Sequence, residues 1–341
     1  MSDLVAVLAF VVCAAAIFLA GGRLSYYGDQ IAELTGLGGA WIGLILMAFV
    51  TSLPELMVGI SSVSLVGSAD LAVGDVLGSC AINLLILASL DIFVPSRRRL
   101  FGMASHSHVM AAALGIVLFA TVGVGLMSGD SLALTPWIGL SSIAFLVIYL
   151  ASVRFIFRYS QDAPDPAVQP PLDDTLASPA PDRARLRRAI TRYALFAAVV
   201  VAAAVALPPA AEAIARMSGL QESFVGTVFL ALSTSLPELA VSLAAIRMGA
   251  IDMAVGNILG SNLFNILILS VDDAFYRGGL LLADASGSHL LTVFATIAMS
   301  GVAIVGLTIP SAGKRFLLAG DAALMLLIYG GNATMLYLLQ R

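Results

Sequence analysis

Long apolar runs, separated by short polar stretches, follow one another along nearly the whole chain. A helix needs about 20 largely apolar residues to cross the hydrocarbon core of a bilayer. By this measure the sequence predicts ten transmembrane spans, at 3–22, 39–63, 69–92, 103–127, 133–156, 190–212, 222–246, 251–274, 287–308 and 315–338. The expected fold class is therefore an all-α membrane protein with ten transmembrane helices.

Composition supports this interpretation. Of the 341 residues, 60% are hydrophobic and 11% are charged, with a mean hydropathy of +1.01, whereas a soluble domain has roughly 25% charged residues. Both cysteines, Cys13 and Cys80, lie inside apolar runs and suggest packing, not a disulfide or a metal cluster. The first apolar run lacks a basic leader, so we expect a retained span and not a signal peptide.

The stretch 157–189 is rich in Pro, Asp and Ala and has little to bury, which predicts a linker. It separates a first five-helix repeat, 1–156, from a second, 190–341. If the ten spans cross the membrane alternately, all Lys and Arg residues lie on the same side of the membrane as this linker, except Arg216, Arg277 and Arg341. By the positive-inside rule the linker is cytoplasmic, and both termini face outward from an inner (plasma) membrane.

An internal repeat links the two halves. Residues 51–55 read TSLPE, and 234–238 read TSLPE again. Each copy is followed by a Gly-Ser segment, GDVLGSCAIN at 74–83 and GNILGSNLFN at 256–265. Because each half holds an odd number of spans, the second copy must enter the membrane from the opposite face. The sequence thus predicts inverted repeats, an arrangement found in many secondary transporters.

Each TSLPE segment carries the features of an ion site. Pro54 and Pro237 should interrupt their helices near mid-membrane, where irregular backbone is tolerated only inside protein or along a cavity. Glu55 and Glu238 follow directly, and a carboxylate at that depth indicates function. The neighbouring hydroxyls are hard oxygen ligands, which suit Ca²⁺ or Na⁺; they belong to Thr51, Ser52, Thr234 and Ser235.

The Gly-Ser segments add a second set of candidate ligands. Ser79 and Asn83 are four residues apart and share a helical face, as do Ser261 and Asn265. Gly78 and Gly260 precede the serines and would allow another backbone to approach closely. Taken singly, a mid-membrane proline is often a kink, and a lone hydroxyl usually bonds its own helix. Duplication of the whole set favours a cation cage built from four helices.

These motifs resemble the two alpha repeats of the calcium/cation antiporter superfamily, most closely its sodium/calcium exchanger branch. The likeness is close over 40–90 and 222–272. It implies that Glu55 and Glu238 bind Ca²⁺ directly. Hydroxyls and carbonyls would bind Na⁺, and access would alternate by sliding of spans 3–22 and 190–212. The hydroxyl roles fall on Thr51, Ser52, Ser79, Thr234, Ser235 and Ser261.

The sequence departs from that pattern at three places. Asn265 stands where exchangers commonly have Asp, the glycine usual before Thr-Ser is Val50 in one copy and Ser233 in the other, and Asp75 replaces the asparagine that its counterpart Asn257 retains. Three roles stay open for Asp75: a further ligand, a proton carrier, or a solvated residue near a helix end.

We therefore expect a secondary antiporter, not an enzyme, that exchanges Ca²⁺ for Na⁺, with H⁺ or another divalent cation as the alternative. Expected partners are the bilayer and the transported cations, without cofactor or nucleic acid, and we expect a monomer. An ion channel or a membrane hydrolase would need an axial pore or a nucleophile with its base, which the motifs do not supply. His106 and His108 are expected to be solvated, and Asp321 and Asn332 to hydrogen-bond a neighbouring helix.

Overall fold

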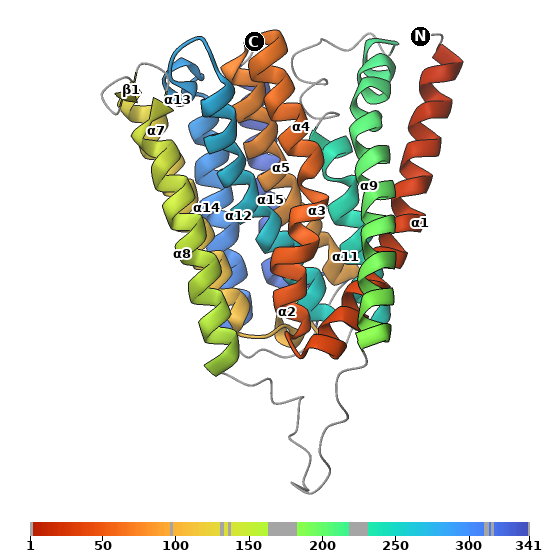
Figure 1. The fold of residues 1–341 in the computed structure, drawn as a ribbon. Coiled ribbons are helices and arrows are strands. Elements are labelled where there is room, and N and C mark those ends of the chain that lie inside the picture. Colours follow the sequence, from red (N-terminus) through yellow and green to blue (C-terminus); the bar gives the residue numbers. More distant parts are fainter. Residues whose placement is uncertain are drawn as a thin grey trace, which may run out of the picture.

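The computed structural model is an upright bundle of long helices (Figure 1). It describes residues 3–95, 98–129, 133–135, 138–162, 183–217, 231–309, 314 and 317–339. Nine helices in these ranges are long and apolar enough to cross a membrane. The seventh predicted span, 222–246, begins outside the described residues, and its described part is helical over 231–234 and again from Leu236.

The first half of the chain contains most of the irregular helical segments. Its helices are α1 Asp3–Thr35, α2 Gly39–Trp41, α3 Ala48–Thr51, α4 Leu53–Ser61, α5 Ala69–Leu90, α6 Leu100–Met103, α7 Ser107–Ser128 and α8 Leu140–Asp162. Two π-helical segments, η1 Ile42–Met47 and η2 Ser62–Val66, and a 3-10 turn, η3 Asp91–Phe93, connect them. A short antiparallel pair, β1 Ala133–Thr135 and β2 Ile138–Gly139, precedes α8.

The second half repeats this order with fewer interruptions in its described part. Its helices are α9 Arg183–Met217, α11 Leu236–Met248, α12 Ile251–Phe275, α13 Leu281–Asp284, α14 His289–Thr308 and α15 Gly320–Leu339. Helix α1 begins and α15 ends at the same face of the bundle (Figure 1). We call this face the termini face.

The ends of two predicted spans are wrong. Helix α1 continues to Thr35, through most of the predicted loop 23–38, and α9 covers more than the predicted 190–212. At Gly21, near the predicted end of the span, α1 instead packs closely on α11, where an added Cβ would lie 3.2 Å from the Cβ of Ala240. Helices α8 and α9 also extend into both ends of the predicted linker, and residues 163–182 lie outside the described ones.

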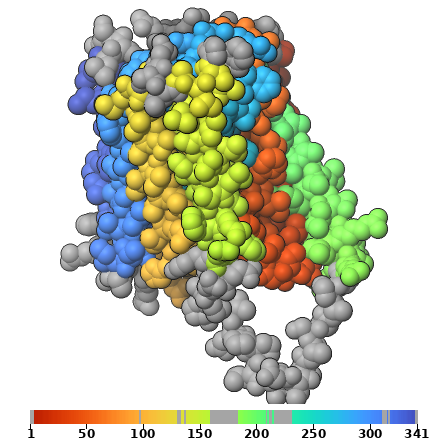
Figure 2. Space-filling model, turned by 60° about the vertical axis from the view of Figure 1, so that its left-hand side comes forward, coloured from red at the N-terminus to blue at the C-terminus, as the bar shows by residue number. Residues whose placement is uncertain are grey.

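The bundle has a polar centre and an apolar outside. Helices α5 and α12 lie at the centre and are buried along most of their length. Helices α1 and α9 pack chiefly against each other at one edge (Figure 1). Helices α7 and α8 lie side by side on the face shown in Figure 2, where α8 exposes apolar side chains such as Val147 and Leu150. Such a surface is what lipid tails require of a membrane protein.

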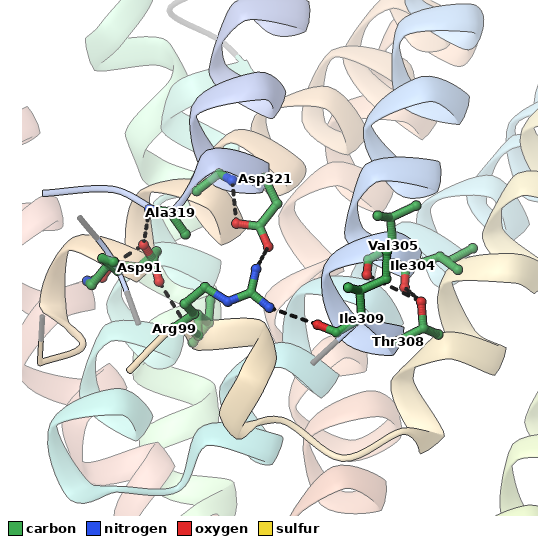
Figure 3. Close-up of polar contacts among 11 residues, drawn as sticks. Asp91, Arg99, Ile304, Val305, Thr308, Ile309, Ala319 and Asp321 are labelled. Carbon is green, nitrogen blue, oxygen red and sulfur yellow. Dashed lines mark hydrogen bonds and ion pairs between the residues drawn. The ribbon is translucent and has the colours of Figure 1, made fainter. Parts of the chain in front are cut away.

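Two buried aspartates, 182 residues apart, fix the ends of the central helices in equivalent ways. Asp91 accepts hydrogen bonds from the backbone N–H groups of Leu100, at 2.8 Å, and Ala319, at 2.8 Å (Figure 3). Asp273 accepts one from the N–H of Leu281, at 2.9 Å. Each aspartate thus holds the first residue of the short helix that follows its own central helix. The match supports the predicted repeat.

The last span is tied to the first half by an ion pair. Arg99 Nη1 lies 2.8 Å from Asp321 Oδ2, and Arg99 Nη2 donates to the carbonyl of Ile309 at 3.1 Å (Figure 3). Both side chains are largely buried, at 12% and 8% exposed. Asp321 therefore bonds to a segment 222 residues away in sequence, and not simply to a neighbouring helix as expected.

A second symmetric pair joins the two repeats at opposite ends of the bundle. His108 Nε2 lies 2.9 Å from Asp252 Oδ1, and His289 Nε2 lies 3.1 Å from Asp70 Oδ1. Each aspartate begins a central helix of the other repeat. His106 is exposed as predicted, but the prediction of a solvated His108 is wrong, because its side chain is 1% exposed. Its partner lies 144 residues away, so local sequence gave no sign of the contact.

Candidate cation-binding site

Each TSLPE segment interrupts its helix at the serine. Ser52 (φ −90°, ψ 3°) separates α3 from α4, and Ser235 (φ −83°, ψ 2°) precedes α11. Pro54 and Pro237 then lie in the first turn of the following helix, where a missing N–H is tolerated. The interruptions are a single residue long, because Ser52 still donates to Ala48 and accepts from Leu56 through its backbone.

The two glutamates lie in the first turn of α4 and α11, where the helix dipole favours negative charge. Both are 0% exposed. Glu238 Oε1 accepts hydrogen bonds from Ser261, at 3.2 Å, and Ser52, at 3.4 Å, while Oε2 has no partner among the described residues. Neither oxygen of Glu55 accepts a hydrogen bond there, and this carboxylate interacts electrostatically with Glu238 and Asp75.

The hydroxyls of the two repeats are paired crosswise. Thr51 Oγ1 lies 3.2 Å from Ser261 Oγ, and Thr234 Oγ1 lies 3.2 Å from Ser79 Oγ. These are equivalent contacts, since Thr51 matches Thr234 and Ser79 matches Ser261. All four side chains are 0% exposed. The structure therefore brings the TSLPE segment of each repeat onto the Gly-Ser helix of the other.

The candidate amides differ between the repeats. Asn83 Nδ2 donates to Asn262 Oδ1 at 3.1 Å, which leaves the carbonyl oxygen of Asn83 without a partner. Asn265 lacks a partner at both polar atoms among the described residues. The difference arises because the residue equivalent to Asn262 is Cys80, which offers no amide. Sequence reasoning missed Asn262, although its mismatch with Cys80 between two otherwise similar motifs was a signal.

The unpartnered atoms at this centre are nearly all oxygens. They comprise both oxygens of Glu55, Glu238 Oε2, the side-chain oxygens of Asn83 and Asn265, and Ser235 Oγ. Buried polar groups without partners are costly, and oxygens of this kind are the ligands of hard cations. Among the described residues, no three His, Cys, Asp or Glu side chains cluster closely enough to hold a metal. The neutral oxygens of this centre are therefore the candidates that would complete a shell around the two glutamates.

Of the two glycines predicted to allow close approach, Gly260 does so within the described residues. A Cβ added to Gly260 would lie 2.1 Å from the carbonyl oxygen of Leu44 in η1, so the backbones of α12 and η1 are in direct contact. At Gly78 the nearest described atom would be Ala231 Cβ at 3.4 Å, an ordinary contact. The π-helical turn in η1, which no local pattern predicted, lies at the tight contact; such turns are frequent at functional sites.

Asp75 does not lie in water. Its side chain is 2% exposed, and neither carboxylate oxygen has a partner among the described residues. The solvated alternative is therefore wrong, while the ligand and proton-carrier alternatives stay predictions.

Comparison with known proteins agrees with this geometry. The family model described as sodium/calcium exchanger protein matches residues 5–157 and 189–338. The chain belongs to this family. A sodium/calcium exchanger family protein is a multi-pass membrane transporter, and this one is a cation/calcium antiporter of the calcium/cation antiporter superfamily.

Individual relatives cover most of this family member. It is 31% identical over 247 residues to the inner membrane protein YrbG of Escherichia coli, covering 72% of each chain. CaxA of Alkalimonas amylolytica, provisionally named an antiporter, is 30% identical over 279 residues, which cover 81% of this chain and 83% of CaxA. The solved sodium-calcium exchanger NCX_Mj, soaked with 10 mM Na⁺ and zero Ca²⁺, shares the fold with a TM-score of 0.75. That match has 19% identity and covers 97% of this chain and 99% of NCX_Mj.

Proposed function

We propose that the protein exchanges Ca²⁺ for Na⁺ at one site between the two TSLPE segments. The observation that carries this proposal is the pair of fully buried glutamates, Glu55 and Glu238. Three of their four carboxylate oxygens have no partner among the described residues, and no described basic side chain pairs with them. Leaving a buried carboxylate uncompensated is strongly unfavourable, so a cation belongs there. Relatives named as sodium/calcium exchangers, including MaX1 of Methanosarcina acetivorans, are consistent with these ions.

The proposed ligand set follows from the unpartnered and crosswise-paired groups. The glutamates would bind Ca²⁺ together with the amide oxygens of Asn83 and Asn265. The four hydroxyls of the crosswise pairs would give up their contacts with each other to bind Na⁺, and Ser52 and the unpartnered Ser235 Oγ would add two further oxygens. Each hydroxyl has lone pairs left when its proton points elsewhere. The two glutamates balance one Ca²⁺ or two Na⁺, so the exchange would carry no net charge.

Proton coupling is the second candidate, and one observation favours it. Both repeats carry an amide at the equivalent position, Asn83 or Asn265. The site therefore lacks a third carboxylate, which would strengthen Na⁺ binding. Two protons on the glutamates would balance the charge as well as two Na⁺ would. The two candidates differ in the gradient that drives Ca²⁺ movement.

Alternating access would come from sliding of α1 and α9. The two helices pack chiefly on each other, and α1 also packs on α11. Polar contacts to the rest of the bundle include Ser25 Oγ to the carbonyl of Val241, at 2.8 Å, and Tyr193 Oη to the carbonyl of Leu46, at 3.0 Å. Because both acceptors are backbone carbonyls, the helices could shift without exposing a buried charge.

The protein would act as a monomer in the inner membrane, with the termini face outside and the linker 157–189 in the cytoplasm. This orientation is supported by the distribution of Lys and Arg. Labelling of single cysteines placed in the linker, from one side of sealed vesicles, tests it.

The test of function is ⁴⁵Ca²⁺ uptake into proteoliposomes without ATP, driven by a Na⁺ gradient and, separately, by a pH gradient. We expect uptake with Na⁺ and its loss in Glu55→Gln and Glu238→Gln. Glu33→Gln, which removes an exposed charge on α1, is the matched control and should transport normally. Retained Ca²⁺ transport in either glutamate variant would refute the proposed site, and uptake with the pH gradient alone would select proton coupling.

A further inference from the structure

A second pair of acidic side chains, Asp75 on α5 and Asp272 on α12, is buried without partners. Asp75 is 2% exposed and Asp272 is 0% exposed. None of their four carboxylate oxygens accepts a hydrogen bond from a described residue. Asp272 is not part of either repeat motif, and its neighbour Asp273 is fully engaged with the N–H groups of Gly139 and Leu281. The pair therefore differs from the structural aspartates of this fold.

Comparison of the two repeats explains how the pair meets. In the second repeat, the equivalent of Asp75 is Asn257, whose Nδ2 donates to Ser242 Oγ at 3.0 Å and whose Oδ1 accepts from Thr51 at 3.3 Å. This arrangement is neutral and saturated. In the first repeat, the residue equivalent to Ser242 is Gly59.

The space left by Gly59 is filled by Asp272. A Cβ added to Gly59 would lie 2.5 Å from Asp272 Oδ2 and 2.6 Å from Oδ1. The carboxylate of Asp272 thus occupies the place that the Ser242 side chain takes in the other repeat, and it interacts electrostatically with Asp75. Where the second repeat has an amide and a hydroxyl bonded to each other, the first repeat has two carboxylates.

Two carboxylates in a buried position repel each other and need positive charge. The charged groups that act on the pair are all acidic. Asp272 interacts electrostatically with Asp75 and Asp273, and Asp75 interacts with Glu55. The described residues place no Lys, Arg or His in an ion pair with Asp75 or Asp272, although they do so for Asp70, Asp91, Asp252 and Asp321.

We propose that Asp75 and Asp272 form a second divalent-cation site, separate from the glutamate pair, and that it binds Ca²⁺. Two carboxylates match one divalent charge, and their oxygens are hard ligands whose remaining partners would be water. Gly59 lies four residues after Glu55 and therefore one turn further along α4, on the same face. Since α4 and α12 both run toward the termini face, the second site lies between that face and the central site (Figure 1).

In that position the second site would hold an ion on its way to or from the glutamates. The inference rests on the proposed function, because its ion is the proposed substrate. It adds a binding step for which the central ligands are not needed. The two proposals can therefore fail separately.

The test measures equilibrium ⁴⁵Ca²⁺ binding to the purified full-length protein in detergent. We expect about two Ca²⁺ per chain in the unchanged protein and about one in Glu55→Gln/Glu238→Gln, since each carboxylate pair holds its own ion. Asp75→Asn/Asp272→Asn should also bind about one, and the fourfold variant should bind none. Glu33→Gln is the control for loss of a single charge elsewhere.

A triple variant guards against misfolding. Gly59→Ser/Asp75→Asn/Asp272→Ala rebuilds in the first repeat the neutral pair that the second repeat already contains, so it should fold and still lose one Ca²⁺. The proposal is overturned if the glutamate double variant binds no Ca²⁺, or if the triple variant binds as much as the unchanged protein. If binding is unchanged but its pH dependence shifts in the triple variant, protons and not a metal occupy the pair. Failure of the central site alone would appear as normal transport in the glutamate variants.

Discussion

Gly260 offers a quantitative test of how closely α12 and η1 must approach. Replacing it with alanine would place the new Cβ 2.1 Å from the Leu44 carbonyl oxygen and 2.7 Å from its Cα. Carbon atoms in good contact are about 3.5–4.0 Å apart, so the backbone must move by roughly 1 Å or more. Leu44 cannot turn away, because the atoms in contact belong to its main chain.

Gly260→Ala should lower the free energy of unfolding by about 3 kcal/mol or more, the upper end of the usual penalty for overpacking a core. Gly115→Ala in α7 is the control, because it changes another buried helical glycine, whose added Cβ would lie 3.9 Å from the side chains of Leu263 and Phe119. In this control, replacing a helical glycine with alanine should raise the free energy of unfolding by about 0.5–1 kcal/mol. The two variants should therefore differ in stability by more than about 3 kcal/mol.

The assay measures the fraction of protein that stays monodisperse after heating in detergent. Ca²⁺ uptake is then measured in proteoliposomes made from that fraction. Gly260→Ala should lose its fold at a clearly lower temperature than Gly115→Ala and should transport poorly, because Ser261 moves with the backbone. Equal stability of the two variants would show that the contact between α12 and η1 is looser than described, and the reasoning would fail.

Three further predictions concern charge and polar partners. Asn265→Asp adds a third carboxylate to the central site, so Ca²⁺ exchange should become voltage-sensitive, by up to about 2.3 kcal/mol per 100 mV, whereas the unchanged protein should respond little to an imposed potential in proteoliposomes. Arg99→Met strands the buried Asp321 carboxylate and should destabilise the protein by about 3–5 kcal/mol, and adding Asp321→Asn should restore most of the thermal stability. Asn262→Ala frees the amide of Asn83 and should weaken Ca²⁺ binding by about 1–3 kcal/mol in ⁴⁵Ca²⁺ titrations, with unchanged affinity counting against the pairing.

Much of the fold could be predicted because its signals are local and repeated. Apolar runs fixed the positions of most spans, and the duplicated TSLPE segments indicated two inverted halves and the central glutamates. The C-terminal end of α1 could not be predicted, because the packing of Gly21 on Ala240, a residue 219 positions away, is not visible in the sequence. For the same reason His108 seemed a surface residue until Asp252 was seen beside it.

The candidate site was less predictable where the repeats differ. Asp272 lies outside the motifs, and nothing in the sequence places it against Gly59. Asn262 and Cys80 were visible as a mismatch, but only the contact between Asn83 and Asn262 shows that one amide is held, while Asn265 has no partner among the described residues. Contacts between residues about 180 positions apart decide these differences, and no local pattern encodes them.

The crosswise hydroxyl pairs have a consequence for how far the two halves of the chain can act apart. Because Thr51 pairs with Ser261 and Thr234 with Ser79, each hydroxyl pair takes one member from each repeat. Either five-helix repeat alone would present only one hydroxyl of each pair. The packing interface between the two repeats is therefore also the proposed ion site, so a change that loosens this interface should weaken ion binding with it.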